Sequence, residues 1–215
     1  MSTADQTADP VPAAVAGSPS TGMLLIISGP SGVGKTTITH AVERAFPDAC
    51  FSVSATTRTR TSQDRDGVDY HFISDAMFDE MVRDGAFLEH AGVFGKRYGT
   101  PRKWVEDQLV AGRLVILEID VQGAQSVKKL RPDAYGLFVL PPSEQELLTR
   151  LRSRGRDDEG AIQRRFSAAQ QEIWVAQQCN AYDCFLVNRD LNEAIASAIA
   201  LVRAVRQTRS VAARV

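Results

Sequence analysis

The chain has 215 residues and a formal net charge of −1. This length is enough for one sizeable hydrophobic core with small inserted subdomains, but not for two large independent domains. The near-neutral charge gives no overall electrostatic reason to bind nucleic acid or an anionic membrane, so any anion site has to be local. The longest apolar runs, such as residues 23–27 and 114–117, are far shorter than the roughly 20 residues that cross a bilayer. We therefore expect one globular unit without a membrane span.

The N-terminal segment is rich in Ala, Pro, Ser, Thr and Asp and has neither a basic start nor a continuous apolar stretch. We expect residues 1–21 to be a disordered tail rather than a secretory signal. The three cysteines, Cys50, Cys179 and Cys184, are an odd number in a chain without an export signal. This favours reduced thiols and a cytoplasmic location.

Short apolar runs alternate with helical patterns along most of the chain. The run at 23–27 ends at a Gly-rich segment, as a buried parallel strand that enters a phosphate loop does. A helix should follow from 35 to about 46, where Pro47 stops it. Three more runs predict strands that are each followed by a helix, at 114–119, 135–140 and 184–187. This alternation predicts an α/β fold with about five parallel strands flanked by helices.

Capping patterns mark two of the expected helix starts. Ser143 is followed by Glu146, and Asp190 is followed by Glu193, which is the spacing of a capping box. Both patterns come just after an expected strand, so both helices should begin there.

Two segments interrupt the core pattern. Residues 52–102 contain short pieces rich in Thr, Arg, Asp and Gly, with strand candidates at 70–73 and 86–89, and we expect a small mixed α/β insertion there. Residues 150–160 are dense in charge, which predicts an exposed, mobile segment between two helices. The expected parts are a core domain over 22–207, made of 22–54, 104–149 and 166–207, with an insertion at 55–103, a helical lid at 150–165 and a C-terminal tail at 208–215.

Residues 29–36 read GPSGVGKT, which satisfies the phosphate-loop (Walker A) pattern G-x-x-x-x-G-K-[ST]. Small residues let the loop amides converge on a β-phosphate, and the next helix presents its positive end to the same anion. Lys35 should bridge the β- and γ-phosphates, and the Thr36 hydroxyl should ligate Mg²⁺. The predicted ATP-binding residues are Gly29, Pro30, Ser31, Gly32, Val33, Gly34, Lys35, Thr36 and Thr37.

Several further motifs follow the phosphate loop in a fixed order. They are FSVSATTR at 51–58, GVDYHF at 67–72, FLEHA at 87–91, YGTP at 98–101, LEIDVQGA at 117–124, LPPS at 140–143 and RFSAAQQE at 165–172. With these motifs, the chain resembles guanylate kinases from Ser28 to about Glu193. The resemblance implies transfer of the γ-phosphoryl group of ATP to GMP with Mg²⁺, in a core with a GMP-binding insertion and a lid.

The resemblance also implies which residues surround GMP or dGMP, a substrate choice that the sequence leaves open. They are Ser54, Arg58, Tyr70, Glu89, Tyr98 and Thr100. Guanine presents two adjacent donors, N1–H and the 2-amino group, which an ionised Glu89 can accept as a pair. A hydroxyl of Ser54 or Thr100 can donate to guanine O6. The guanidinium of Arg58 and the two phenols suit the GMP phosphate.

One position departs from the family pattern. Guanylate kinases commonly have a second phosphate-binding arginine three residues after the first, where this chain has Thr61. Our hypothesis is that Arg60, one place earlier, reaches the phosphate instead. Asp64 also stands where a longer Glu is usual, so this edge of the site departs from the family pattern at two positions.

Further charged residues complete the expected site. Glu118 and Asp120 end an apolar strand, where they can organise Mg²⁺ through water, and Asp120 can also contact GMP; alternatively they only cap a helix. In the lid region the match implies Arg150, Arg154 and Arg165, which together with Lys35 would stabilise the migrating phosphoryl group. No general base is needed, since the acceptor phosphate is already ionised.

Two other functions are compatible with a phosphate loop. A related P-loop kinase could act on a sugar phosphate, but Glu89 and the YGTP motif would then have no guanine edge to read. A non-catalytic interaction module that binds phosphorylated peptides could dispense with the loop and lid cations, yet Lys35, Thr36 and Arg154 are all present. The sequence does not distinguish a monomer from a homodimer.

Overall fold

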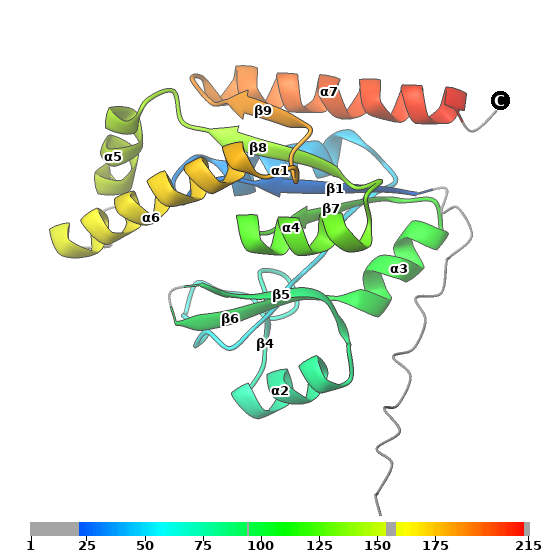
Figure 1. The fold of residues 1–215 in the computed structure, drawn as a ribbon, viewed down its shortest axis with the longest axis horizontal. Helices are drawn as coiled ribbons and strands as arrows, with labels where there is room; N and C mark the ends of the chain where they lie inside the picture. Colours follow the sequence, from blue (N-terminus) through cyan, green and yellow to red (C-terminus); the bar gives the residue numbers. More distant parts are fainter. Residues whose placement is uncertain (1–21, 94, 154–157, 213–215) are drawn as a thin grey trace, which may run out of the picture.

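The computed structural model describes residues 22–93, 95–153 and 158–212. Five parallel strands form the central sheet in the order β2-β7-β1-β8-β9. Their bounds are β1 Met23–Ser28, β2 Ala49–Phe51, β7 Leu114–Glu118, β8 Tyr135–Leu140 and β9 Cys184–Val187. β1 lies at the centre, and the phosphate loop therefore leaves the carboxyl end of the middle strand (Figure 1).

Helices cover both faces of this sheet, which explains why its central strands are almost entirely apolar. On one face lie α1 Lys35–Ala45 and α7 Leu191–Ala212, which contact alternate residues of β1 such as Leu25. On the other face, α3 Arg102–Val110 and α4 Val121–Leu130 pack on the intervening residues of β1, such as Leu24. Figure 1 shows the two helical layers above and below the sheet.

The insertion is a second, smaller sheet beside the core. Its strands run in the order β4-β3-β6-β5. Their bounds are β3 Ala55–Thr56, β4 His71–Phe72, β5 Phe87–Val93 and β6 Lys96–Pro101, and α2 Asp75–Arg83 packs against them. β5 also contacts α4, so one side of this sheet faces the core (Figure 1).

The predicted lid at 150–165 falls on parts of two helices, α5 Glu144–Ser153 and α6 Glu159–Gln178, and its residues 154–157 lie outside the described residues. We expected residues 150–160 to be exposed and mobile, and this is wrong at its N-terminal end. Leu151 is only 2% exposed and packs with Leu147, Ile162 and Ala169. Leu147 and Leu151 stand four residues apart on one face of α5, so they form an apolar stripe that the density of charge concealed.

Most of the expected core elements are confirmed. The strands at β1, β7, β8 and β9 and the helix α1 agree with their predicted ranges to within one residue. Both capping patterns are present: the Glu146 amide donates to Ser143 Oγ (3.1 Å), and the Glu193 amide donates to Asp190 Oδ1 (3.0 Å). The prediction named no residues for β2, β6, α2 or α3.

The two chain ends give different outcomes. The predicted tail at 1–21 lies outside the described residues. The predicted C-terminal tail from 208 is wrong for its first part, since α7 continues to Ala212. No Gly or Pro follows residue 207 to end the helix. Among the described residues, no helix combines the length and the apolar character needed to cross a bilayer.

Candidate functional site

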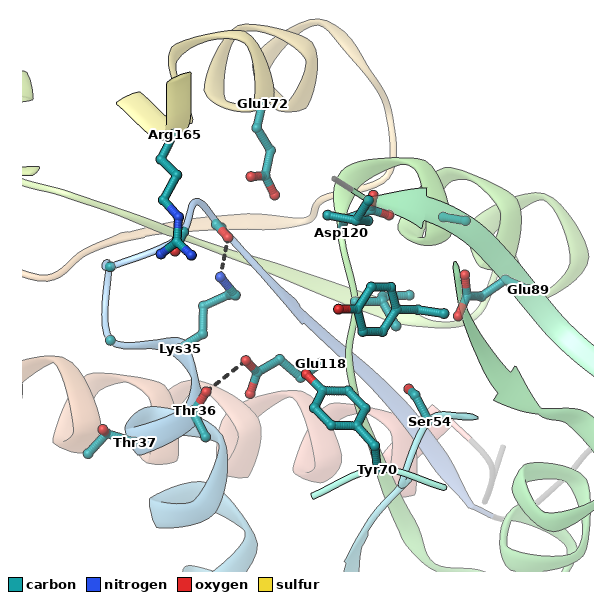
Figure 2. Close-up of a pocket in the computed structure, with 18 residues that line it drawn as sticks. Lys35, Thr36, Thr37, Ser54, Tyr70, Glu89, Glu118, Asp120, Arg165 and Glu172 are labelled. Atoms are coloured by element: carbon teal, nitrogen blue, oxygen red, sulfur yellow. Dashed lines mark hydrogen bonds between the residues drawn. The ribbon is translucent and has the colours of Figure 1, made fainter. Parts of the chain in front are cut away.

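A cavity of about 520 Å³ opens between the core and the insertion, at the carboxyl ends of the central strands. This is the edge where open α/β sheets bind ligands. Phosphate-loop residues line one side, and residues of the insertion line the other (Figure 2). The predicted site residues that line it are Gly29, Ser31, Gly32, Gly34, Lys35, Thr36, Thr37, Ser54, Tyr70, Glu89, Tyr98, Glu118, Asp120 and Arg165.

The phosphate loop has glycine at three points where φ is positive. Gly29 has φ +144°, Gly32 has φ +92° and Gly34 has φ +95°, a region that residues with a Cβ rarely occupy. A Cβ on Gly34 would also lie 2.8 Å from Asn188 Nδ2. That amide donates to the Val33 carbonyl (2.8 Å). Asn188, directly after β9, therefore holds the loop through the Val33 carbonyl. The sequence analysis did not identify this residue.

Lys35 and Thr36 begin α1 and project into the cavity. The Lys35 ammonium donates to the carbonyls of Gly29 and Pro30, the latter at 3.0 Å (Figure 2). The Thr36 hydroxyl donates to Glu118 Oε1 at 2.9 Å. These contacts bring the end of β7 to the start of α1. Lys35 thus lies folded along the loop whose amides would surround a phosphate.

Glu118 has one carboxylate oxygen in an unusual environment. Its Oε2 is buried and has no hydrogen-bond partner among the described residues. An unsatisfied buried carboxylate oxygen is costly unless a cation or water reaches it. Next to the Thr36 hydroxyl, this oxygen gives the set of hard oxygen donors that Mg²⁺ prefers. The described residues contain no cluster of three His, Cys, Asp or Glu side chains able to hold a metal, so most ligands would be phosphate oxygens and water.

Asp120 both caps a helix and faces the cavity. Its Oδ1 accepts from the Gly123 amide at 2.8 Å, which makes it the N-cap of α4. The capping role that the sequence left open is therefore present. Burial raises the pKa of the Asp120 carboxyl, while the amides of Gly123 and Gln122 and the charge of Lys35 oppose that rise.

Glu89 lies at the opposite end of the cavity on β5 (Figure 2). The side chain is 7% exposed, and its Oε1 accepts from the Thr100 hydroxyl at 2.5 Å. Burial raises the pKa of Glu89 to about 7. Its Oε2 faces the first turn of α4, where a Cβ on Gly123 would approach within 2.6 Å. Thr100 thus donates a hydrogen bond to Glu89 and does not itself line the cavity. The Ser54 hydroxyl does line the cavity.

Two phenols lie between Glu89 and the phosphate loop. The rings of Tyr70 and Tyr98 meet edge to face with centroids 5.6 Å apart. Burial raises the pKa of Tyr70 to about 12, so its phenol stays a neutral donor at ordinary pH. Arg58 lies behind this pair, with its guanidinium carbon 5.2 Å from the Tyr70 ring centroid.

The loop of the insertion that departs from the family pattern fixes the position of Arg58. It does not bring a second arginine to the cavity. Asp64 accepts from both terminal nitrogens of Arg58 at 2.9 Å and from the Thr61 hydroxyl at 2.7 Å. Arg60 points elsewhere: its Nε donates to the Asp64 carbonyl at 3.0 Å, and its side chain is exposed. Neither Arg58 nor Arg60 is among the residues that line the cavity.

The three predicted lid arginines have different positions. Arg165, on α6, lines the cavity and points toward the phosphate loop (Figure 2). Arg150 is turned away from the cavity: its Nε donates to Glu146 (2.9 Å) and one terminal nitrogen donates to the Asn188 carbonyl (3.1 Å). Arg154 lies outside the described residues. Of the two that the structure describes, Arg165 lines the cavity and Arg150 does not.

One cavity-lining carboxylate was missed by the sequence analysis. Glu172, on α6, points into the same space as Arg165 (Figure 2). It stands seven residues after Arg165, which is nearly two helical turns and therefore the same helix face. This spacing was a signal available in the sequence, within the motif RFSAAQQE.

Comparison with known proteins agrees with this geometry. The family model described as guanylate kinase matches residues 21–205. The guanylate kinase of Anaeromyxobacter dehalogenans is 48% identical over 85% of this chain and 80% of its own length. That of Coxiella burnetii is 42% identical over 87% of this chain and 90% of its own length.

A solved structure matches as well. The crystal structure of guanylate kinase from Anaplasma phagocytophilum has a TM-score of 0.71 and 33% sequence identity, and the match covers 87% of each chain. Because a family model spans most of the chain and close relatives align along nearly all of it, the chain belongs to the guanylate kinase family, enzymes that transfer a phosphoryl group from ATP to GMP.

Proposed function

We propose that this chain transfers the γ-phosphoryl group of Mg²⁺-bound ATP to GMP, with the two phosphate chains meeting in the cavity between the loop and the insertion. The observation that carries the proposal is the position of Glu89. A buried carboxylate, supported by Thr100, faces the same cavity as Lys35 from the opposite end. That spacing suits a nucleoside monophosphate whose base lies at Glu89 and whose phosphate points at the loop.

Recognition of guanine follows from the polarity of this pocket. An ionised Glu89 accepts the N1–H and 2-amino donors of guanine, whereas adenine has an acceptor at N1 and lacks the amino group. The Ser54 hydroxyl, which lines the cavity, can donate to guanine O6. A pocket built on such pairings rejects a mismatched base by roughly 10⁴-fold or more, because its buried groups would be left unpaired. The pairing involves only the base, so dGMP should also be accepted.

The acceptor phosphate would lie near Tyr70 and Tyr98, whose phenols can donate to its oxygens. Arg58, which is paired with Asp64, stacks on Tyr70 and would hold that phenol in place. On the donor side, the loop amides and Lys35 would hold the β- and γ-phosphates. Arg165 approaches from α6, where a guanidinium can stabilise charge on the migrating group.

Mg²⁺ fits the residues around Thr36 and Glu118. The buried, unpartnered Glu118 Oε2 beside the Thr36 hydroxyl supports this position, and Asp120 can hold water around the ion. When bound, the metal would neutralise negative charge that builds up on the phosphates during transfer. No proton has to be removed from the acceptor, since a monophosphate is ionised at neutral pH.

Closure of the lid is part of the proposal. α5 and α6 share a small apolar cluster of their own, and α6 carries Arg165 over the cavity. Movement of α5 with the N-terminal half of α6 toward the insertion would exclude water and limit idle hydrolysis of ATP. We place the activity in the cytoplasm, in purine nucleotide metabolism, where it would recycle GMP.

The test is a steady-state assay with GMP, dGMP, AMP and UMP as acceptors under saturating Mg-ATP. GMP and dGMP should be phosphorylated, and AMP and UMP should be poor substrates. Comparable turnover of a sugar phosphate in the same ADP-release assay would instead favour a sugar-phosphate kinase. Absence of any ATP binding by calorimetry would favour a non-catalytic module.

A further inference from the structure

The cavity is lined by more acidic than basic side chains, although it would receive two phosphate chains. Among the described residues that line it, Lys35 and Arg165 are cationic, while four side chains are carboxylates. The carboxylates are Glu89, Glu118, Asp120 and Glu172. Three of them have a reason to be there, namely guanine, Mg²⁺ and the cap of α4. Glu172 has no such role.

Glu172 is oriented toward the space that the phosphates would occupy. It is on the face of α6 that carries Arg165, and its carboxylate points between Arg165 and Asp120, on the Lys35 side (Figure 2). Among the described residues, no hydrogen bond or ion pair is formed by its side chain. Burial raises the pKa of Glu172 and Asp120 raises it further, while the Lys35 ammonium opposes the rise.

The packing of α6 keeps Glu172 in this position. Ile162 and Ala169 fix the N-terminal half of the helix against α5, and Ala176 packs against Phe138 of the core sheet. Glu172 lies between these two anchored segments. Its carboxyl group therefore stays at the cavity wall, where an ionised group interacts with other charges more strongly than in bulk water.

We propose that Glu172 makes the site selective for nucleotide that carries Mg²⁺. Its carboxylate repels phosphates whose charge is not neutralised, and Mg²⁺ removes about half of the charge of ATP and with it most of the repulsion. Free ATP, which could occupy the site unproductively, is thereby disfavoured relative to Mg-ATP. The inference rests on the proposed function, since it takes ATP to be the ligand at the phosphate loop.

The test compares ATP binding to the unmodified chain and to Glu172→Gln by isothermal titration calorimetry, once with EDTA and once with excess Mg²⁺. Glutamine keeps the shape of the side chain and removes its charge. We expect the variant to bind Mg-free ATP about 5- to 10-fold more tightly, an effect of the size expected for one partly screened charge pair. Mg-ATP binding should tighten by clearly less.

The matched control is Glu80→Gln, which makes the same charge change on the exposed side of α2. It should change neither affinity, and neither variant should melt at a lower temperature than the unmodified chain. Equal tightening with and without Mg²⁺, no change in either condition, or weaker Mg-ATP binding by Glu172→Gln would each overturn the inference. Failure of the unmodified chain to phosphorylate GMP would overturn the proposed function instead, because the binding comparison uses no GMP.

Discussion

The Arg58 guanidinium and the Asp64 carboxylate form a two-point ion pair, with both nitrogen–oxygen distances at 2.9 Å. Arg58 also stacks on the rings of Tyr70 and Phe72. The pair holds the pKa of Asp64 well below its usual range. Thr61, at the position where the family pattern has a second arginine, donates to the same carboxylate. The two residues that depart from the family pattern, Thr61 and Asp64, thus help to orient one arginine.

Replacing Asp64 by Asn should therefore impair the use of GMP. Arg58 would keep its stacking on Tyr70 but lose its charged partner and its fixed orientation. We expect KM for GMP to rise several-fold while KM for ATP stays unchanged. Asp107→Asn is a suitable control, because it breaks an exposed pair with Lys103 on α3. An unchanged KM for GMP would show that Arg58 is not positioned by Asp64.

Position 123 offers a test in which GMP binding should weaken without a loss of stability. A Cβ on Gly123 would lie 2.6 Å from Glu89 Oε2, so Gly123→Ala should displace the carboxylate and raise KM for GMP. The same change replaces a glycine in the first turn of α4 by the best helix former, worth up to about 1 kcal/mol. Thermal unfolding should therefore show no loss of stability. A stable variant with normal KM for GMP would show that Glu89 does not contribute to GMP binding.

The stability of the chain should respond to the titration of Glu89. Its pKa is about 7 in the fold and ordinarily 4.5, so between these values the folded chain holds a proton that the unfolded chain releases. The free energy of unfolding therefore falls as pH rises through this window, by an amount on the order of 3 kcal/mol at most.

Glu89→Gln removes this titration, since glutamine is neutral throughout. Urea unfolding at about pH 5 and about pH 8 should show the variant gaining stability relative to the unmodified chain at the higher pH, by roughly 1–3 kcal/mol. Glu80→Gln, on the exposed side of α2, should show no such trend. A constant difference between Glu89→Gln and the unmodified chain at both pH values would rule out a buried, titrating Glu89.

Lys35→Ala tests the donor side of the cavity. Loss of the ammonium should lower kcat by about 10²–10³-fold, the typical cost of removing one charge-stabilising donor from a transition state. The fold should persist, since the hydrogen bonds of this side chain are to two carbonyls of its own loop. Lys103→Ala, in an exposed helix pair, is the control, and a near-normal kcat for Lys35→Ala would contradict the assigned role.

The sequence predicted the features that depend on local pattern. These features are the apolar runs of β1, β7, β8 and β9, the glycines of the phosphate loop and the capping boxes. Each is recognised from residues that are close together in the sequence. β2 escaped prediction because it is three residues long and half-buried, and its place in the sheet comes from pairing with β7. The apolar side of α5 escaped because Leu151 stands between Arg150 and Arg152 in the charged stretch.

Within the site, the sequence indicated residue types but not orientations. It placed Thr100 beside guanine, whereas the fold turns its hydroxyl to Glu89, because β5 and β6 pair at that register. It predicted that Arg150 binds the phosphates, whereas Glu146, one turn earlier, holds the Arg150 guanidinium away from the cavity. Arg60 as a phosphate ligand stays a prediction, and in this structure its side chain is directed to the backbone of Asp64.

The most direct test of guanine recognition is kcat/KM for GMP, IMP and AMP, measured with the unmodified chain and with Glu89→Gln. IMP keeps the N1–H donor of guanine and lacks the 2-amino group, so it isolates half of the pairing. GMP should exceed AMP by about 10⁴-fold or more, with IMP between them, and Glu89→Gln should remove most of that range. A Glu89→Gln variant that still separates the three bases as the unmodified chain does would contradict recognition by the carboxylate at position 89.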